Sequence, residues 1–273
     1  MAIAANPARY LAEVAEGSAS GETARIYAEI RRLTGVPFVA LIYRHLATIP
    51  HALEALWRAV GHRLQSGELQ ECAWRIGRDA WKGPAADLPD DVRSLGNEEL
   101  ARIGDVIDAY NRANPVNFAI VCALSAMPPT PAARRTSRAN WTPPPAMPGL
   151  PPIAPVAGLP PAVRKHVDAF GKTGSAGMPV LVPTLYRHLA HWPDFLALAH
   201  REVQPRLAAG LFRTAIDDFR IAIQTEAASF ACNRAMVTDP VLRSVAPVFE
   251  RFTGVIPEMV VVGSFLSRTL RQT

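Results

Sequence analysis

An internal repeat constrains the fold of this chain more than any other feature. The segment LIYRHLATIPHALEALWRAVGHRLQSG (41–67) aligns without gaps with TLYRHLAHWPDFLALAHREVQPRLAAG (184–210), and 12 of the 27 positions are identical. Ordinary composition would give about two identities. A weaker match pairs VIDAYNRANPVNFAIVCALS (106–125) with VFERFTGVIPEMVVVGSFLS (248–267). Two copies are too few for a solenoid. The repeat therefore predicts a pseudo-dimer whose halves are related by an approximate twofold axis.

The hydrophobic pattern predicts helices almost throughout the chain. Residues 21–33 carry apolar side chains at helical spacing, and no stretch alternates with a period of two as a half-buried strand would. We predict an all-α protein of ten to twelve helices, with a first repeat at 1–126, a linker at 127–161 and a second repeat at 162–273. The linker holds 12 of the 25 prolines, a composition typical of extended connectors. Trp141 is its expected anchor.

Composition excludes several classes of protein. The cysteines lie far apart without a CxxC pair, which argues against disulfides and cysteine-bound zinc: Cys72, Cys122 and Cys232. The N-terminus lacks a secretory pattern and the longest apolar run is too short for a bilayer, so we expect a cytoplasmic protein without membrane contact. The formal charge is +5, but the basic residues are scattered among acids. Their one cluster lies in the linker at Arg134, Arg135 and Arg138. We therefore expect no nucleic-acid partner.

The two halves differ at the proline of the second match. Asn114 precedes Pro115, whereas Ile256 precedes Pro257. The residue before a proline is held extended, and proline favours the first turn of a helix. We therefore expect Asn114 and Asn117 near the N-terminus of a buried helix, where they could hold an anion or orient a water molecule. The alternative is that Asn114 only caps this helix.

The paired YRHLA motifs offer a second candidate site at His45 and His188, each flanked by Tyr and Arg. Their identity in both copies instead favours a structural role inherited from the ancestral unit. The sequence contains no GxSxG, HExxH, phosphate-binding loop or dinucleotide fingerprint. We predict no cofactor and no metal.

Several segments resemble the group I 2-haloacid dehalogenases, which act on both D and L substrates. They are ASGETARIYAEIRRLTGVPFVALIYRHLATIP, YNRANPVNFAIVCALS and HLAHWPDFL. The similarity covers most of the chain outside the linker. It implies an all-α pseudo-dimer related to the AhpD-like helical fold, with a small-molecule carboxylate as ligand. It also implies hydrolysis by attack of an activated water on C2, without a metal or a covalent ester.

The resemblance places the family's site residues on named positions of this chain. The family's active-site asparagine, which holds the hydrolytic water, falls on Asn114. Its pocket aromatics fall on Phe38 and Leu41, and a pocket tyrosine falls on Phe249. An adjacent Ser-Asp pair falls on Thr184 and Leu185, followed by Tyr186. Threonine can replace serine as a hydroxyl donor, but leucine has no proton acceptor with which to activate water.

The loss of this aspartate leaves two main hypotheses. The chain could hydrolyse a 2-substituted carboxylate with another base, for which the candidates are Tyr186, His188, Glu258 and Asp194. Asp194 is better explained as a helix-dipole partner. The alternative is a non-hydrolytic relative that keeps the fold and the cavity as a binding module. An AhpD-like redox activity is disfavoured by the absence of CxxC. Pairing of two copies into a homodimer is left open.

Overall fold

The computed structural model describes residues 9–125, 141–173, 178–227, 229–230, 232 and 234–272. Over this part of the chain the structure contains α-helices, short 3-10 turns and two isolated β-bridges, but no strand. The α-helices are α1 (Gly21–Thr34), α2 (Leu41–Leu46), α3 (Ala52–Gln65), α4 (Glu68–Gly77), α5 (Asp90–Arg93), α6 (Gly96–Ser125), α7 (Pro161–Ala169), α8 (Thr184–Leu189), α9 (Pro193–Ala208), α10 (Arg213–Ala227) and α11 (Asp239–Leu270). The predicted all-α class is confirmed.

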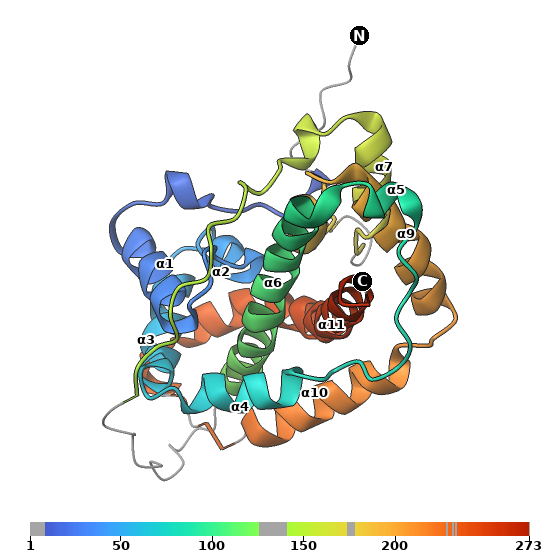
Figure 1. Cartoon of the computed structure of the whole chain (residues 1–273). Helices are drawn as coiled ribbons and strands as arrows, with labels where there is room; N and C mark the ends of the chain where they lie inside the picture. Colours follow the sequence, from blue (N-terminus) through green and yellow to red (C-terminus); the bar gives the residue numbers. More distant parts are fainter. Residues whose placement is uncertain are drawn as a thin grey trace.

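The two longest helices, α6 and α11, form the centre of the molecule, and the shorter helices surround them (Figure 1). The helices of the two halves follow in the same order. Helix α8 begins 143 residues after α2, and α11 begins 143 residues after α6. At the contact between the long helices, Gly263 of α11 faces Asn111, whose side-chain nitrogen donates to the Gly263 carbonyl at 3.2 Å. A side chain at Gly263 would collide with that amide.

Helix α6 passes through Pro115 without interruption. The expectation that Asn114 and Asn117 lie at a helix N-terminus is therefore wrong. A proline inside a helix removes one backbone hydrogen bond, but packing can offset this cost. The residues after Pro115 are buried as far as Leu124. In addition, the Pro115 ring lies against Gly77 of α4, where an added Cβ would be 2.5 Å from the proline Cγ. Tertiary packing therefore overrides the local signal.

Residues 141–160 of the linker (the strap) run from the first half to the second (Figure 1), and they are extended apart from a 3-10 turn at Val156–Gly158. Near its start, the Met147 amide donates to the Gly35 carbonyl at 2.8 Å. Near its end, the Arg187 Nε donates to the Ala154 carbonyl at 3.0 Å. The strap thus connects the two halves by backbone carbonyls and amides. The arginine cluster at 134–138 lies outside the described residues.

The start of the strap is held by Trp141, whose ring covers Gly67. Gly67 has φ +73°, and an added Cβ would lie 2.1 Å from Trp141 Cε2. We expect Gly67→Ala to lower the free energy of unfolding by about 2 kcal/mol or more, because left-handed strain alone costs about 1 kcal/mol and the indole must also move. Urea unfolding measures the loss. Gly96→Ala is the matched control, since Gly96 has φ +81° with nothing within 4 Å. Equal losses in both variants would contradict the Trp141 contact.

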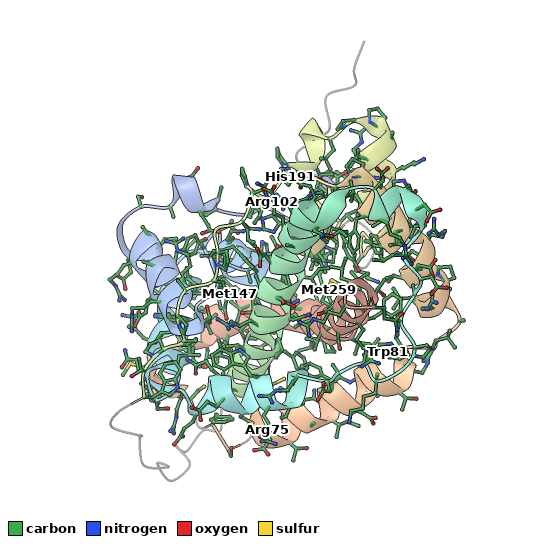
Figure 2. The ribbon with its side chains drawn as sticks, in the orientation of Figure 1. Arg75, Trp81, Arg102, Met147, His191 and Met259 are labelled. Atoms are coloured by element: carbon green, nitrogen blue, oxygen red, sulfur yellow. The ribbon has the colours of Figure 1, made fainter. Side chains whose placement is uncertain are left out.

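Charged side chains lie mainly at the periphery, as Arg75 and Arg102 do in Figure 2, whereas Met259 lies in the interior. Many of these charges form pairs within a helix turn, such as Arg102 with Glu98 at 2.8 Å. Exposed pairs of this kind contribute little to stability. None of the helices in the described part of the chain combines the length and hydropathy needed to cross a bilayer.

Candidate functional site

A small cavity lies among α2, α6, α8 and α11. Its volume is about 40 Å³, which is space for about three water molecules. Its lining combines apolar side chains with four polar ones: Tyr110, Asn114, Asn117 and Thr184. No Asp, Glu, Lys or Arg is among the described residues that line it. The cavity is therefore a neutral site with hydrogen-bonding groups.

Equivalent positions of the sequence repeat meet across this cavity. The lining contains six such pairs, 142 or 143 residues apart: Ala40 with Pro183, Leu41 with Thr184, Ile42 with Leu185, Tyr110 with Phe252, Asn114 with Ile256, and Asn117 with Met259. The α6 members are all polar and the α11 members are all apolar. The two sides of the lining therefore differ in chemistry. The α6 side, formed by Tyr110, Asn114 and Asn117, is the polar wall of the cavity.

The polar wall includes an amide donor without an acceptor. The Tyr43 hydroxyl donates to Asn117 Oδ1 at 2.9 Å. Asn117 Nδ2 is buried and has no hydrogen-bond partner among the described residues. One helical turn earlier, the Asn114 amide also makes no hydrogen bond within the described part of the chain. A buried unmade hydrogen bond costs about 1–3 kcal/mol, so this wall favours a ligand that accepts hydrogen bonds.

Tyr110 of the polar wall forms a hydrogen bond with His188, which lies behind it. The His188 Nε2 lies 2.9 Å from the carbonyl oxygen of Pro151 in the strap, and Nδ1 lies 2.9 Å from the Tyr110 hydroxyl. A carbonyl can only accept, so the proton is assigned to Nε2, and the Tyr110 hydroxyl donates to Nδ1. Burial lowers the pKa of His188 to about 4. His188 is therefore neutral at pH 7.

Thr184 lies near the Tyr110 hydroxyl and interacts with it through its side chain. Burial raises the pKa of Tyr110, which the Thr184 contact and the positive charges of Arg44 and Arg187 partly oppose. Tyr110 consequently stays protonated at neutral pH. It presents a hydroxyl oxygen, and not a phenolate, to the cavity.

The YRHLA motifs bind the segment that precedes α1, at Ala12 and Glu13. The Arg44 and Arg187 guanidiniums both bind the Glu13 carboxylate, at 2.8 and 3.0 Å. His45 Nδ1 lies 2.7 Å from the Ala12 carbonyl oxygen, so His45 contacts backbone and does not line the cavity. His188 reaches the cavity only through Tyr110. Equivalent histidines of the two motifs thus have different partners.

The structure brings five of the sequence-predicted candidates together in the cavity lining: Leu41, Asn114, Asn117, Thr184 and Leu185. Phe38 lies behind Tyr110, with ring centroids 4.4 Å apart. Tyr186 stacks on Phe170 at 3.5 Å, and its buried hydroxyl has no partner among the described residues. Phe249 lines a separate depression beside Leu124.

The candidate replacement bases also lie away from the cavity lining. Glu258 forms an ion pair with Lys172 at 2.7 Å, and Asp194 is exposed in the first turn of α9. Sequence reasoning missed Tyr110 because it expected a new helix to begin at Pro115. In an unbroken helix, positions 110, 114 and 117 share one face, so helical spacing was the signal that could have identified it.

Comparisons with known proteins agree with this fold. A configuration-inverting 2-haloacid dehalogenase from Alcaligenes xylosoxydans xylosoxydans is 28% identical over 216 residues, which cover 72% of this chain and 69% of that enzyme. This chain is its homologue. No protein-family model matches the sequence.

Solved structures extend the similarity to nearly the whole chain. A D-2-haloacid dehalogenase in complex with L-LA superposes with a TM-score of 0.75 at 16% identity, covering 96% of this chain and 97% of that one. A mutant of a D-2-haloacid dehalogenase gives a TM-score of 0.74, also at 16% identity, with 96% of each chain covered. At this level of identity the superpositions establish the common fold.

Proposed function

We propose that the chain is a group I member of the 2-haloacid dehalogenase family, with the AhpD-like fold, that binds a small 2-substituted carboxylate between its two repeats without hydrolysing it. The observation that carries the binding proposal is the Asn117 Nδ2 in the cavity lining, which has no hydrogen-bond partner among the described residues and lies one helical turn from the Asn114 amide. Both amides can donate to an oxygen acceptor, and the Thr184 side chain lines the cavity from α8.

The same geometry argues against hydrolysis. Attack on a carbon–halogen bond by water needs a proton acceptor near the water. Leu185 occupies the position where the family resemblance puts an aspartate, and no other carboxylate lines the cavity in the described part of the chain. One observation favours the hydrolytic alternative, namely the contact between Tyr110 and His188. However, a histidine with a pKa of about 4 is a weak base at neutral pH.

Ligand entry requires side chains to move, because a cavity of about 40 Å³ has room for only a few water-sized groups. Met259 is suited to this movement, since methionine is unbranched and adopts several rotamers. The positive charges of Arg44 and Arg187 are only partly balanced by Glu13. Their excess charge behind Tyr110 would favour an anion in the cavity over a neutral ligand.

Replacement of Asn117 tests this proposal. We expect Asn117→Leu to bind 2-chloropropionate ten- to a hundredfold more weakly than the natural chain, because a hydrogen bond to a charged group contributes about 1.5–3 kcal/mol. Isothermal titration calorimetry measures the affinity. Asn97→Leu, at an exposed site on the same helix, is the matched control and should bind normally. Unchanged binding by Asn117→Leu would reject the assignment of the cavity, and chloride release by the natural chain would reject the non-hydrolytic reading.

A further inference from the structure

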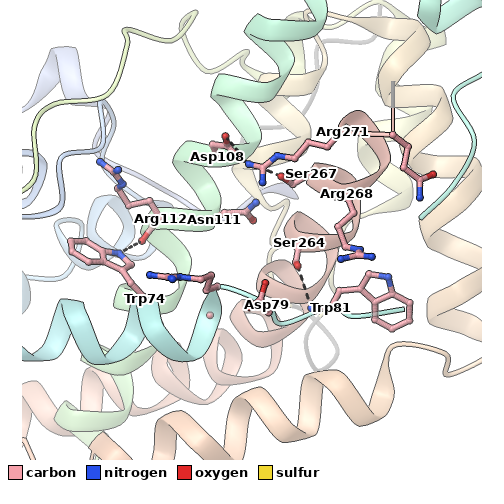
Figure 3. Close-up of a pocket in the computed structure, with 13 residues that line it drawn as sticks. Trp74, Asp79, Trp81, Asp108, Asn111, Arg112, Ser264, Ser267, Arg268 and Arg271 are labelled. Atoms are coloured by element: carbon pink, nitrogen blue, oxygen red, sulfur yellow. Dashed lines mark hydrogen bonds and ion pairs between the residues drawn. The ribbon is translucent and has the colours of Figure 1, made fainter. Parts of the chain in front are cut away.

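A cleft outside the cavity is lined by several charged side chains. It has a volume of about 620 Å³ and lies where the C-terminal ends of α4 and α11 meet the middle of α6 (Figure 3). It shares no lining residue with the cavity. On α6 the cleft uses residues 108, 111 and 112, which lie about half a turn around the helix axis from 110, 114 and 117.

Hydrogen bonds between different elements hold the walls of the cleft in place. The Trp74 Nε1 donates to the Arg112 carbonyl at 2.9 Å and joins α4 to α6. The Trp81 backbone amide donates to Ser264 Oγ at 3.2 Å and joins the loop after α4 to α11. These contacts are visible in Figure 3, with the two indoles at opposite sides of the opening. The space between them is therefore framed by fixed elements.

The charge of the cleft is predominantly positive. Four arginines and two aspartates line it: Arg78, Arg112, Arg268, Arg271, Asp79 and Asp108. Asp108 is bound by Arg271 at 3.3 Å and by Ser267. Neither Arg78 nor Arg268 makes a hydrogen bond or ion pair within the described part of the chain. Figure 3 shows the Arg268 guanidinium between Ser264 and Trp81, at the mouth of the cleft.

Helix dipoles explain only part of this charge. A cation is favoured at a helix C-terminus, which accounts for Arg78 at the end of α4 and Arg271 at the end of α11. Arg112 lies in the middle of α6, where no helix end attracts it. Its Nη1 donates to the Pro145 carbonyl at 3.4 Å. The cleft is thus lined by arginines of α6, α11 and the end of α4, and Arg112 is the one that no helix end explains.

We propose that this cleft binds a small polyanion that carries at least two phosphoryl or carboxylate groups. Guanidinium forks bind both groups in a bidentate manner. Arg78 and Arg268, which make no ion pair within the described part of the chain, and a space in the usual range for small-molecule sites exceed what a single monocarboxylate would use. Two aspartates leave an excess of two positive charges, which requires more than one negative charge for neutrality.

Titration with pyrophosphate, followed by calorimetry, tests the proposal. The natural chain should bind one pyrophosphate saturably, and several-fold more weakly in 300 mM than in 20 mM salt. Arg78→Ala with Arg268→Ala should weaken binding at least tenfold. Asp79→Asn, which removes an exposed negative charge from the cleft, should bind several-fold more tightly. A parallel titration with citrate distinguishes carboxylates from phosphates as the preferred groups.

The matched control is Arg58→Ala with Arg243→Ala, which removes the same charge from exposed sites outside the cleft. This variant should bind pyrophosphate within twofold of the natural chain. Equal weakening in both double variants would show nonspecific attraction and overturn the proposal. Absence of saturable binding to either anion, or no gain in Asp79→Asn, would overturn it too. Circular dichroism confirms that each variant is folded, and the Asp79 variant tests the site without removing any arginine.

Discussion

Leu185→Asp is expected to release chloride from 2-chloropropionate at a rate at least a hundredfold above that of the natural chain. Leu185 is buried in the cavity lining next to Thr184, across from Asn114. A carboxylate there would accept a proton from water held by the Asn114 amide. General base catalysis by a positioned side chain contributes about 10²–10⁴-fold. Burial would raise the pKa of the new carboxyl group, which increases its strength as a base once it is ionised.

Chloride release from each enantiomer of 2-chloropropionate measures this effect, and the configuration of the lactate formed reports the face of attack. Leu185→Asn is the control, because it has the shape of aspartate without a proton acceptor at neutral pH. It should remain inactive. Chloride release by the natural chain at the rate of Leu185→Asp would show that another base acts. Activity of Leu185→Asn would show that polarity alone suffices.

The sequence predicted the helical class because its signals came from long amphipathic segments. Helix α1 was expected over 21–33 and occurs at Gly21–Thr34. Helix α9 begins at Pro193, which agrees with the preference of proline for the first turn of a helix. Pro115 misled the same reasoning, because local propensity cannot register that Gly77 of α4 and a buried run of residues support the proline inside a helix.

The candidate site could be predicted only in part from the sequence. Asn114 and Leu185 were found by comparing positions with the family and between the two repeats, and both line the cavity. Tyr110 needed the knowledge that α6 is continuous. The contact of His188 with the Pro151 carbonyl joins a helix to a proline-rich strap, 37 residues apart in the sequence. No periodicity encodes such a contact, which depends on how the strap crosses the surface.

His188 should make stability depend on pH. Its folded-state pKa is about 4 because of burial, whereas an unfolded histidine titrates near 6.5. Between these values the unfolded chain binds more protons, so stability rises with pH through this window. The stability that depends on the neutral His188 ring is fully present above about pH 6.5, and it is lost as the pH falls towards 4. The difference corresponds to about 3 kcal/mol in the free energy of unfolding.

His188→Gln should flatten this pH dependence, because glutamine can donate to Pro151 and accept from Tyr110 but does not titrate. Urea unfolding at pH 7 and pH 4.5 measures the slope in both proteins. His191→Gln is the matched control, since His191 contacts the neighbouring Pro152 carbonyl at 2.8 Å from an exposed position, where an imidazole loses little hydration on folding. An equal slope in the natural chain and in His188→Gln would mean that His188 is not buried as a neutral ring. The contact with Pro151 would then not anchor the strap beside the cavity.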